Sequence, residues 1–504
     1  MKISLRELIC GLVILLLTLL PGGAPRLALA EDDSRSALVA LKERVQRFTL
    51  KNGLKVIMYR RGIAPVFSAN LAVRVGGIDE SVGSTGLAHM FEHMAFKGTS
   101  SLGTKDFSRE QSLLKEQEEI AARSSGGVNL TESDRARWGD LQAELEKIWD
   151  TTAFDRELKK HGAENLNAYT SQEITAYFVD LPRPAFEFWC WLESERLRDP
   201  VLRQFYQERD VVMEERRMRV EDDPRGKLYE ALLGIAFLRH QYRNPLIGYA
   251  ADISRLTATR AEVFRAKHYV PSNMVITLVG DVDPQRDLEL VRKYFEQLPG
   301  GAPPLRETLA EAPQQGEREF VLEETASPTT MIAYHKPVFP HPDDVLISVM
   351  LEILGGGRIS PLHRELVQKR KLAAQVSYSE GPGQSFPNLM YFSLTPKAPH
   401  TNLEVLQAFD QVVEDFIRKG ATAKQLAIAK RTTAKEYIDS LRTSNSLAHI
   451  LGSTELRYGN WERLIDWYDA VMQVSEADVK RVARLYLQRH SRTVGRLEKK
   501  EVHP

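Results

Sequence analysis

Cysteine is nearly absent from this chain of 504 residues, which contains only Cys10 and Cys190. So few cysteines exclude a disulfide-stabilised scaffold and a cysteine-rich zinc module. The chain also has no excess of charge of either sign, because 68 Lys and Arg residues balance 68 Asp and Glu residues. This balance gives no indication of binding to nucleic acid or to an anionic membrane surface. A composition of 43% hydrophobic and 27% charged residues is typical of a globular protein, and the length predicts several domains.

Long hydrophobic runs are missing as well, apart from one near the N-terminus. Residues 10–20 form an apolar run as long as the core of an export signal and shorter than the ~20 residues that span a bilayer. Lys2 and Arg6 precede this run, and Ala28-Leu29-Ala30 follows it as a cleavage site. The pattern predicts a signal peptide over 1–30, with an uncleaved anchor as the alternative. We therefore expect export, to a bacterial periplasm or beyond it, and no membrane span after cleavage.

The rest of the chain is predicted to form two similar halves with strands and helices. A Pro- and Gly-rich linker over 300–316 separates an N-terminal domain, 31–299, from a C-terminal domain, 317–504. Both repeat the same coarse order of strands, a Gly-rich turn, a helix, more strands and final helices. Residues 105–160 carry apolar residues at helical spacing among many charged ones, which predicts an inserted helical hairpin. As a separate surface element, this hairpin is not expected to disturb a functional site.

One motif carries chemistry, the H-x-x-E-H sequence that runs from His89 to His93. On a helix, residues four apart lie on one face, so both imidazoles can reach one metal ion, with Glu92 beside them. Hydrolytic zinc sites often combine two His with one carboxylate, and a neighbouring carboxylate acts as general base. The motif is that of the inverted zincins. The alternative, on these residues alone, is a helix whose histidines only pack or face solvent.

A third ligand has to come from another segment, and an acidic helix around residues 208–215 offers candidates. Glu208 and Glu215 are two helical turns apart and can point the same way, whereas Glu214 points about 100° away from Glu215. On the residues alone, ordinary surface charge is the simpler explanation of any single Glu in this helix.

With these motifs in order, the chain resembles the pitrilysin/insulinase metallopeptidases, especially the two-domain branch that includes mitochondrial processing peptidases and exported bacterial zinc proteases. The resemblance implies an α+β fold with two homologous domains that face each other as a clamshell. Each domain would be an antiparallel-rich sheet covered by helices on one face. The matching stretches cover nearly all of the mature chain and comprise residues 86–99, 167–171, 175–177, 208–215, 240–242, 247–248, 280–284 and 355–357.

The resemblance also implies the composition of the site. It places one zinc ion (Zn2+) per chain on His89, His93 and Glu215, with Glu92 as the general base. Glu208 corresponds to an acidic residue that supports the ligands from behind. The implied activity is zinc-dependent endoproteolysis of peptides or unfolded protein segments.

The resemblance also implies residues that contact the substrate, apart from the metal ligands. Asn167 and Ala168 match a loop that lies along bound substrate. The strand near Tyr177 resembles the sheet edge to which an extended peptide adds. A peptide or an unfolded protein is therefore the expected partner of this site.

One departure from the family pattern lies in the second half. Active single-chain members carry an Arg and, seven residues later, a Tyr, where this chain has Val367 and Ala374. Neither side chain can donate a hydrogen bond, and loss of such a donor typically costs about 100–1000-fold in rate. We therefore expect a heterodimer in which a homologous subunit without zinc ligands supplies the Arg/Tyr pair. The alternatives are a non-catalytic scaffold subunit of the same fold and a different exported zinc hydrolase, such as an amidase.

Overall fold

The computed structural model describes residues 25–62 and 64–500, which belong to two compact units. The first unit ends at Arg44 and contains helix α2 (Pro25–Arg44), and the second begins at Val45. The apolar core of the predicted signal peptide, 10–20, lies outside the described residues, whereas Ala28-Leu29-Ala30 lies within α2. Among the helices that the structure describes, none combines the length and the apolar character that crossing a bilayer requires.

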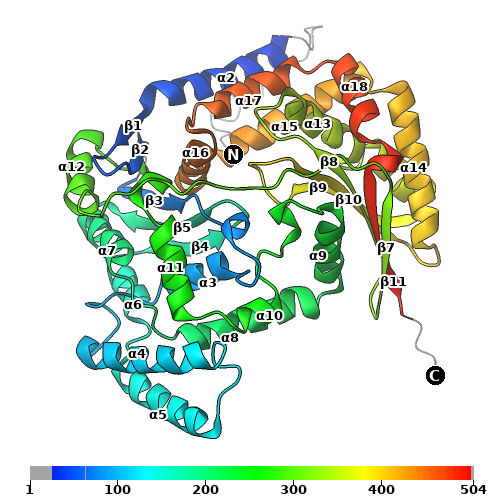
Figure 1. Ribbon diagram of the computed structural model, residues 1–504. Coiled ribbons are helices and arrows are strands. Elements are labelled where there is room, and N and C mark those ends of the chain that lie inside the picture. The colour runs from blue at the N-terminus through cyan, green and yellow to red at the C-terminus, as the bar shows by residue number, and fades with distance from the viewer. Residues whose placement is uncertain (1–24, 63, 501–504) are drawn as a thin grey trace, which may run out of the picture. The chain divides into compact units, whose positions relative to one another are not determined.

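A six-stranded sheet forms the centre of the first half, in the order β1-β2-β6-β3-β5-β4 (Figure 1). The Asn52-Gly53 turn joins β1 and β2 as an antiparallel hairpin, as its sequence predicts. Gly53 has a φ of 91°, which few residues other than glycine adopt. Among the described strands of this sheet, β2 and β6 are the one parallel pair. The strands are β1 (Val45–Thr49), β2 (Lys55–Arg60), β3 (Val66–Val73), β4 (Glu164–Thr170), β5 (Thr175–Pro182) and β6 (Met274–Gly280).

The second half repeats this sheet with five strands, in the order β7-β11-β8-β10-β9. This order matches β2-β6-β3-β5-β4, and the one parallel pair, β7 with β11, takes the place of β2 with β6. The expected α+β fold with two similar sheet-bearing halves is therefore confirmed. The strands are β7 (Arg318–Glu324), β8 (Thr329–Lys336), β9 (Ala373–Gly381), β10 (Asn388–Pro396) and β11 (Arg492–Lys499).

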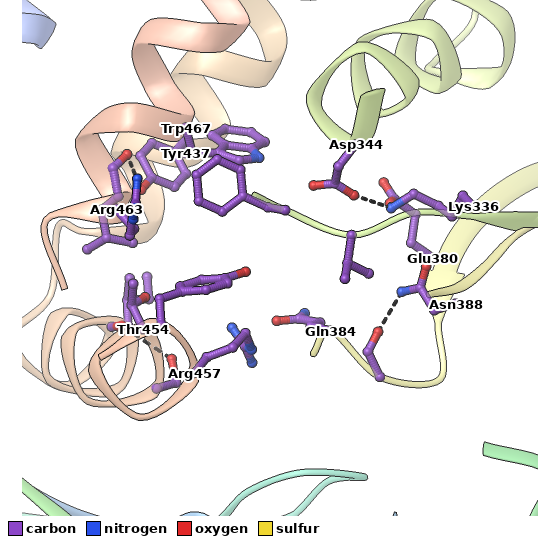
Figure 2. Close-up of a pocket in the computed structure, with 17 residues that line it drawn as sticks. Lys336, Asp344, Glu380, Gln384, Asn388, Tyr437, Thr454, Arg457, Arg463 and Trp467 are labelled. Carbon is purple, nitrogen blue, oxygen red and sulfur yellow. Dashed lines mark hydrogen bonds and ion pairs between the residues drawn. The ribbon is translucent and has the colours of Figure 1, made fainter. Parts of the chain in front are cut away.

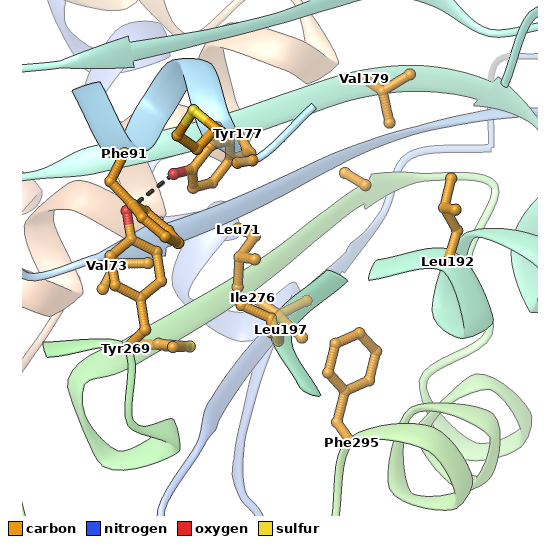
Figure 3. Packing of buried hydrophobic residues seen from close by; sticks show 14 of the residues in the cluster. Leu71, Val73, Phe91, Tyr177, Val179, Leu192, Leu197, Tyr269, Ile276 and Phe295 are labelled. Atoms are coloured by element: carbon orange, nitrogen blue, oxygen red, sulfur yellow. Dashed lines mark hydrogen bonds between the residues drawn. The ribbon is translucent and has the colours of Figure 1, made fainter. Parts of the chain in front are cut away.

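The core of the first half lies between one face of its sheet and a layer of helices (Figure 3). Leu71 and Ile276 from the sheet meet Leu192 and Phe295 from the helices, and all four are essentially inaccessible to solvent. Burial of apolar area, at roughly 25 cal/mol per Å², holds the helices on this face. The helices of this half are α3 (Leu87–Met94), α4 (Phe107–Arg123), α5 (Glu132–Ile148), α6 (Ala153–Lys160), α7 (Phe186–Arg198), α8 (Phe205–Arg216), α9 (Pro224–Ala236), α10 (Ala250–Ile253), α11 (Ala258–His268) and α12 (Pro284–Phe295).

Each sheet is also covered by one helix from the other half. Helix α16 packs on β3 and β6 of the first sheet, and α9 packs on β8 and β11 of the second. Gly452 permits the approach of α16, because a Cβ there would lie 2.8 Å from the Thr277 hydroxyl. The expectation of helices on one face of each sheet is therefore incomplete. The helices of the second half are α13 (Pro342–Gly355), α14 (Asn402–Lys419), α15 (Ala423–Ser440), α16 (Ser444–Tyr458), α17 (Arg463–Gln473) and α18 (Glu476–Tyr486).

Candidate metal site

Helix α3 carries the H-x-x-E-H motif, and its start is fixed by a glycine and a buried carboxylate. Gly86 precedes the helix with a φ of 89°, and a Cβ there would lie 2.4 Å from the Ile247 carbonyl oxygen. The Glu80 carboxylate accepts hydrogen bonds from the backbone N–H groups of Gly86, at 2.8 Å, and Ala88, at 2.7 Å. These bonds satisfy N–H groups that a helix leaves unpaired at its first turn. The orientation of the motif is thus set before its first histidine.

The structure brings together the three predicted ligands, His89, His93 and Glu215. Their candidate ligand atoms all lie within 4.8 Å of one another. Nε2 of His89 is 3.4 Å from Oε2 of Glu215, and Nε2 of His93 is 3.6 Å from the same oxygen. Helix α8 delivers Glu215, and its packing against α3 makes the three side chains converge. Two imidazole nitrogens and one carboxylate form a donor set that suits zinc with an open fourth position.

The two histidines differ in their electrostatics. Burial lowers the pKa of His89 to about 4, so its imidazole is neutral and has a free lone pair at pH 7. Burial opposes the protonation of His93, yet hydrogen bonds to Glu208 and Glu215 raise its pKa to about 9. The hydrogen bond from His93 in turn lowers the pKa of Glu215. A cation is therefore favoured at this point, and a bound metal ion would replace the proton of His93.

Glu208 lies behind His93, as the resemblance implies. Its Oε2 is 3.3 Å from Nδ1 of His93, and Lys97 donates a hydrogen bond to its other oxygen. Despite burial, these two partners lower the pKa of the Glu208 carboxyl. A carboxylate that accepts the Nδ1 proton in a hydrogen bond directs Nε2 toward Glu215, where Nε2 can bind a metal ion once it has lost its own proton.

Replacing Glu208 with Gln is expected to weaken zinc binding by about 10–100-fold, the usual effect of losing an outer partner of a ligating histidine. The measurement is zinc affinity by competition with a chromogenic chelator. Glu214→Gln is the matched control, because Glu214 lies on the same helix and pairs with Arg217 at the surface. Equal zinc affinity of Glu208→Gln and the control would show that Glu208 does not orient the ligand.

Glu92 points toward the edge of the first sheet, where the Thr170 hydroxyl donates a hydrogen bond to its Oε2. Burial raises the pKa of Glu92 above its ordinary value, which makes its carboxylate a stronger proton acceptor. Thr170 was not predicted to take part in the site, because no local spacing connects it to Glu92. Arg219, whose guanidinium is 3.0 Å from Oε1 of Glu215, was not predicted either. The i,i+4 spacing of Glu215 and Arg219 was the signal for that pair.

The predicted substrate residues lie in two adjacent strands, and two predictions about them are wrong. Asn167 and Ala168 lie in strand β4 rather than in a loop, and β4 is the edge of the sheet. Tyr177 lies on β5, which pairs with β4 on one side and with β3 on the other, so the strand of Tyr177 is not an edge. Its ring is buried, and its hydroxyl is 2.8 Å from the hydroxyl of Tyr269 (Figure 3).

The predicted hairpin is present as α4 and α5, with its own apolar cluster that includes Leu113 and Leu141. It is not separate from helix α8, which carries Glu215, however. The Tyr206 hydroxyl on α8 donates a hydrogen bond to Glu118 on α4. Arg209 on α8 donates to the carbonyl oxygen of Gly126, in the turn of the hairpin. The hairpin therefore supports the helix that carries Glu215.

A buried ion pair adds a second connection between the hairpin and the site. Arg203, just before α8, pairs with Glu110 on α4, and both side chains are inaccessible to solvent. Arg203 also donates to the carbonyl oxygens of Thr99 and Leu102, each at 2.9 Å, in the loop that follows α3. Removing one partner of such a buried pair typically costs about 3–5 kcal/mol of stability. The loop that follows α3 is thus held to the segment that precedes α8.

Two family models match most of the chain. The model described as Insulinase (Peptidase family M16) matches residues 55–124 and 146–249. The model described as Peptidase M16 inactive domain matches residues 255–433. The first match is interrupted over 125–145, which covers the turn of the hairpin and most of α5 and is narrower than the predicted insert, 105–160.

Proteins of similar length support the same relationship. The chain is 27% identical to the zinc protease PqqE of Helicobacter pylori over 446 residues, which cover 87% of this chain and 89% of that protein. A crystal structure of a protease from Helicobacter pylori matches with a TM-score of 0.75 and 26% identity, over 90% of this chain and 99% of that one. A peptidase M16 inactive domain from Pseudomonas fluorescens shares the fold, with a TM-score of 0.73 and 18% identity over 91% of this chain and 99% of that one. From the two models, the relatives and the fold, we conclude that the chain belongs to the insulinase-type peptidase family, M16.

Proposed function

We propose that this protein is the zinc-bearing subunit of an exported metalloendopeptidase that hydrolyses peptides or unfolded protein segments. The observation that carries the proposal is the convergence of His89, His93 and Glu215 within 4.8 Å, with Glu92 next to them on α3. The name of the Helicobacter pylori relative, a zinc protease, supports zinc as the metal. The A-x-A pattern at Ala28-Leu29-Ala30 supports export.

The chemistry assigns separate tasks to the side chains. His89, His93 and Glu215 would hold the zinc ion, which supplies Lewis acidity and makes water a better nucleophile near neutral pH. Glu92 accepts the proton of the attacking water and can return it to the leaving amine. The hydrogen bond from Thr170 leaves the other carboxylate oxygen of Glu92, Oε1, available for that proton.

The edge strand supplies a binding mode for an extended substrate. Strand β4 carries Asn167 and Ala168 and ends at Thr170, whose hydroxyl contacts Glu92. A peptide that adds to β4 in extended conformation therefore runs past the proposed base. Main-chain hydrogen bonds would provide affinity with little dependence on sequence, which favours unfolded substrates. Tyr177 contributes from the neighbouring strand as part of the buried support.

A heterodimer remains part of this proposal, because the second half lacks the Arg/Tyr pair of active single-chain members. Val367 packs against the core of the second half, and Ala374 is an exposed residue at the start of β9. Neither can stabilise an oxyanion by a side-chain hydrogen bond. A homologous subunit that lacks zinc ligands would supply the pair. The alternative, a non-catalytic scaffold subunit, is favoured by this missing pair and disfavoured by the complete ligand set.

The test is an assay of the purified chain, loaded with zinc, on a library of unstructured peptides. We expect the chain alone to be at least about 100-fold less active than its mixture with a homologous chain that carries the Arg/Tyr pair. Full activity of the chain alone would exclude the heterodimer but would still support the assignment of the chain as a protease. A chain that purifies without zinc and stays inactive in the mixture would instead support the scaffold.

A further inference from the structure

A cavity of about 400 Å³ lies in the second half, outside the proposed metal site (Figure 2). Its walls come from the ends of β8, β9 and β10, from the loops that follow β8 and β9, and from helices α13, α15, α16 and α17. Helices α3 and α8, which carry the proposed zinc ligands, do not contribute to its lining. The cavity is thus a separate feature that peptide hydrolysis does not explain.

Aromatic side chains line much of the cavity. The rings of Tyr437 and Trp467 lie 4.8 Å apart, and those of Phe339 and Tyr458 lie 5.4 Å apart in an edge-to-face arrangement. The Tyr437 hydroxyl donates to the carbonyl oxygen of Leu464 at 2.9 Å, which fixes the direction of its ring. An apolar or aromatic body of a ligand would find complementary surface here.

The charged groups at one end of the cavity pair with one another. The ammonium of Lys336 is buried and hydrogen-bonds to both Asp344 and Glu380 (Figure 2). Arg463, at the rim, pairs with Asp466 at 2.9 Å. Each of these cations already has a carboxylate partner, so neither leaves a positive charge for a ligand to balance.

Arg457, on α16, differs from Lys336 and Arg463 in its interaction partners. Among the described residues, no carboxylate forms an ion pair with it, and its buried Nε has no hydrogen-bond partner there. Its guanidinium lies 5.8 Å from the centre of the Tyr458 ring and faces Gln384 across the cavity (Figure 2). The nearby carboxylate of Glu173 is occupied, because it accepts hydrogen bonds from the Tyr242 hydroxyl and from the backbone N–H of Gln384. A buried guanidinium nitrogen without a partner beside aromatic walls favours an anionic ligand.

We propose that this cavity binds a carboxylate attached to an aromatic or apolar body, with Arg457 as the charged anchor. A guanidinium holds a carboxylate with two parallel hydrogen bonds, while the aromatic walls take up the rest of the ligand. The C-terminal residue of a peptide and a small free aromatic acid share this chemistry. The inference does not depend on the proposed proteolysis, because it concerns a different set of residues.

The test measures binding by calorimetry to the zinc-loaded Glu92→Gln chain, in which the proposed base is absent, so that no probe is cleaved. The probes are N-acetyl-Gly-Phe with a free carboxylate, the same peptide as its C-terminal amide, and 3-phenylpropanoate. We expect the acid to bind at least about 10-fold more tightly than the amide, since a charge-assisted hydrogen bond is lost in the amide. If 3-phenylpropanoate binds as tightly as the peptide acid, a small aromatic acid is a sufficient ligand. If the peptide acid binds and 3-phenylpropanoate does not, the ligand is the C-terminal residue of a peptide.

Substitutions distinguish the contribution of Arg457 to ligand binding from that of its neighbours. Arg457→Gln is expected to remove the preference for the acid over the amide, and Arg457→Lys to keep part of it. Arg463→Gln is the matched control, because Arg463 lines the same cavity and already has a carboxylate partner. Equal binding of acid and amide to the unsubstituted cavity, no binding of any probe, or an unchanged preference in Arg457→Gln would each overturn the proposal.

Discussion

Glu92→Gln is expected to reduce peptide hydrolysis by at least about 100-fold while zinc stays bound at one ion per chain. General base catalysis contributes typically about 100–10,000-fold, and a neutral amide cannot accept the proton of water. Zinc should be retained, because the proposed ligands are His89, His93 and Glu215, and Gln keeps the size of the side chain and an acceptor for the Thr170 hydroxyl. The measurements are kcat on an unstructured peptide with the partner subunit present and zinc content by elemental analysis.

Glu214→Gln again provides the control, since its carboxylate pairs with Arg217 and faces away from the proposed ligands. It should keep both kcat and zinc content. Wild-type hydrolysis by Glu92→Gln would exclude Glu92 as the base. Loss of zinc from the same variant would instead mean that Glu92 is needed to hold the metal, and the assignment of roles between Glu92 and Glu215 would have to be changed.

Glu215→Ala has the second large expected effect, a loss of zinc affinity of more than about 100-fold. Loss of an outer partner of a ligand already costs about 10–100-fold, and removal of the only carboxylate in the donor set should cost more. The substitution should leave the fold intact, because among the described residues Glu215 forms ion pairs only with the two histidines of the proposed site and with Arg219, whose side chain is 70% exposed. Zinc stoichiometry after dialysis and affinity by chelator competition measure the effect.

Thermal unfolding distinguishes loss of the metal from loss of the fold. In excess chelator, Glu215→Ala and the unsubstituted chain should unfold at similar temperatures, because both are metal-free. Added zinc should raise the unfolding temperature of the unsubstituted chain alone, since a ligand that binds only the folded state stabilises it. If Glu215→Ala keeps stoichiometric zinc at wild-type affinity, the proposed ligand set is wrong.

Features that depend on spacing along the chain could be predicted from the sequence. His89 and His93 share a face of α3 because four residues make about one helical turn. The Asn52-Gly53 turn and the hairpin of α4 and α5 follow from local turn chemistry and from apolar periodicity. The repeated order of elements likewise indicated two similar halves, each of which contains a sheet.

Features that depend on strand order and on packing between distant segments could not be predicted from the sequence. Which strand lies at an edge is decided by all the pairings of the sheet, so β4 is the edge and the strand of Tyr177 is internal. The contact of Thr170 with Glu92, the support of α8 by the hairpin, and the exchange of α9 and α16 between the halves have no local signal. The buried Nε of Arg457, which has no hydrogen-bond partner among the described residues, belongs to the same group.

The sequence by itself determined that two imidazoles and a proton acceptor lie on one turn of helix, because helical geometry is a local property of the chain. Only the tertiary structure decided that Glu215 reaches them, because long-range contacts form where apolar faces pack and buried ion pairs close. The packing of α8 on α3, held by Arg203 and Glu110, brings a third candidate ligand to a motif on one helix.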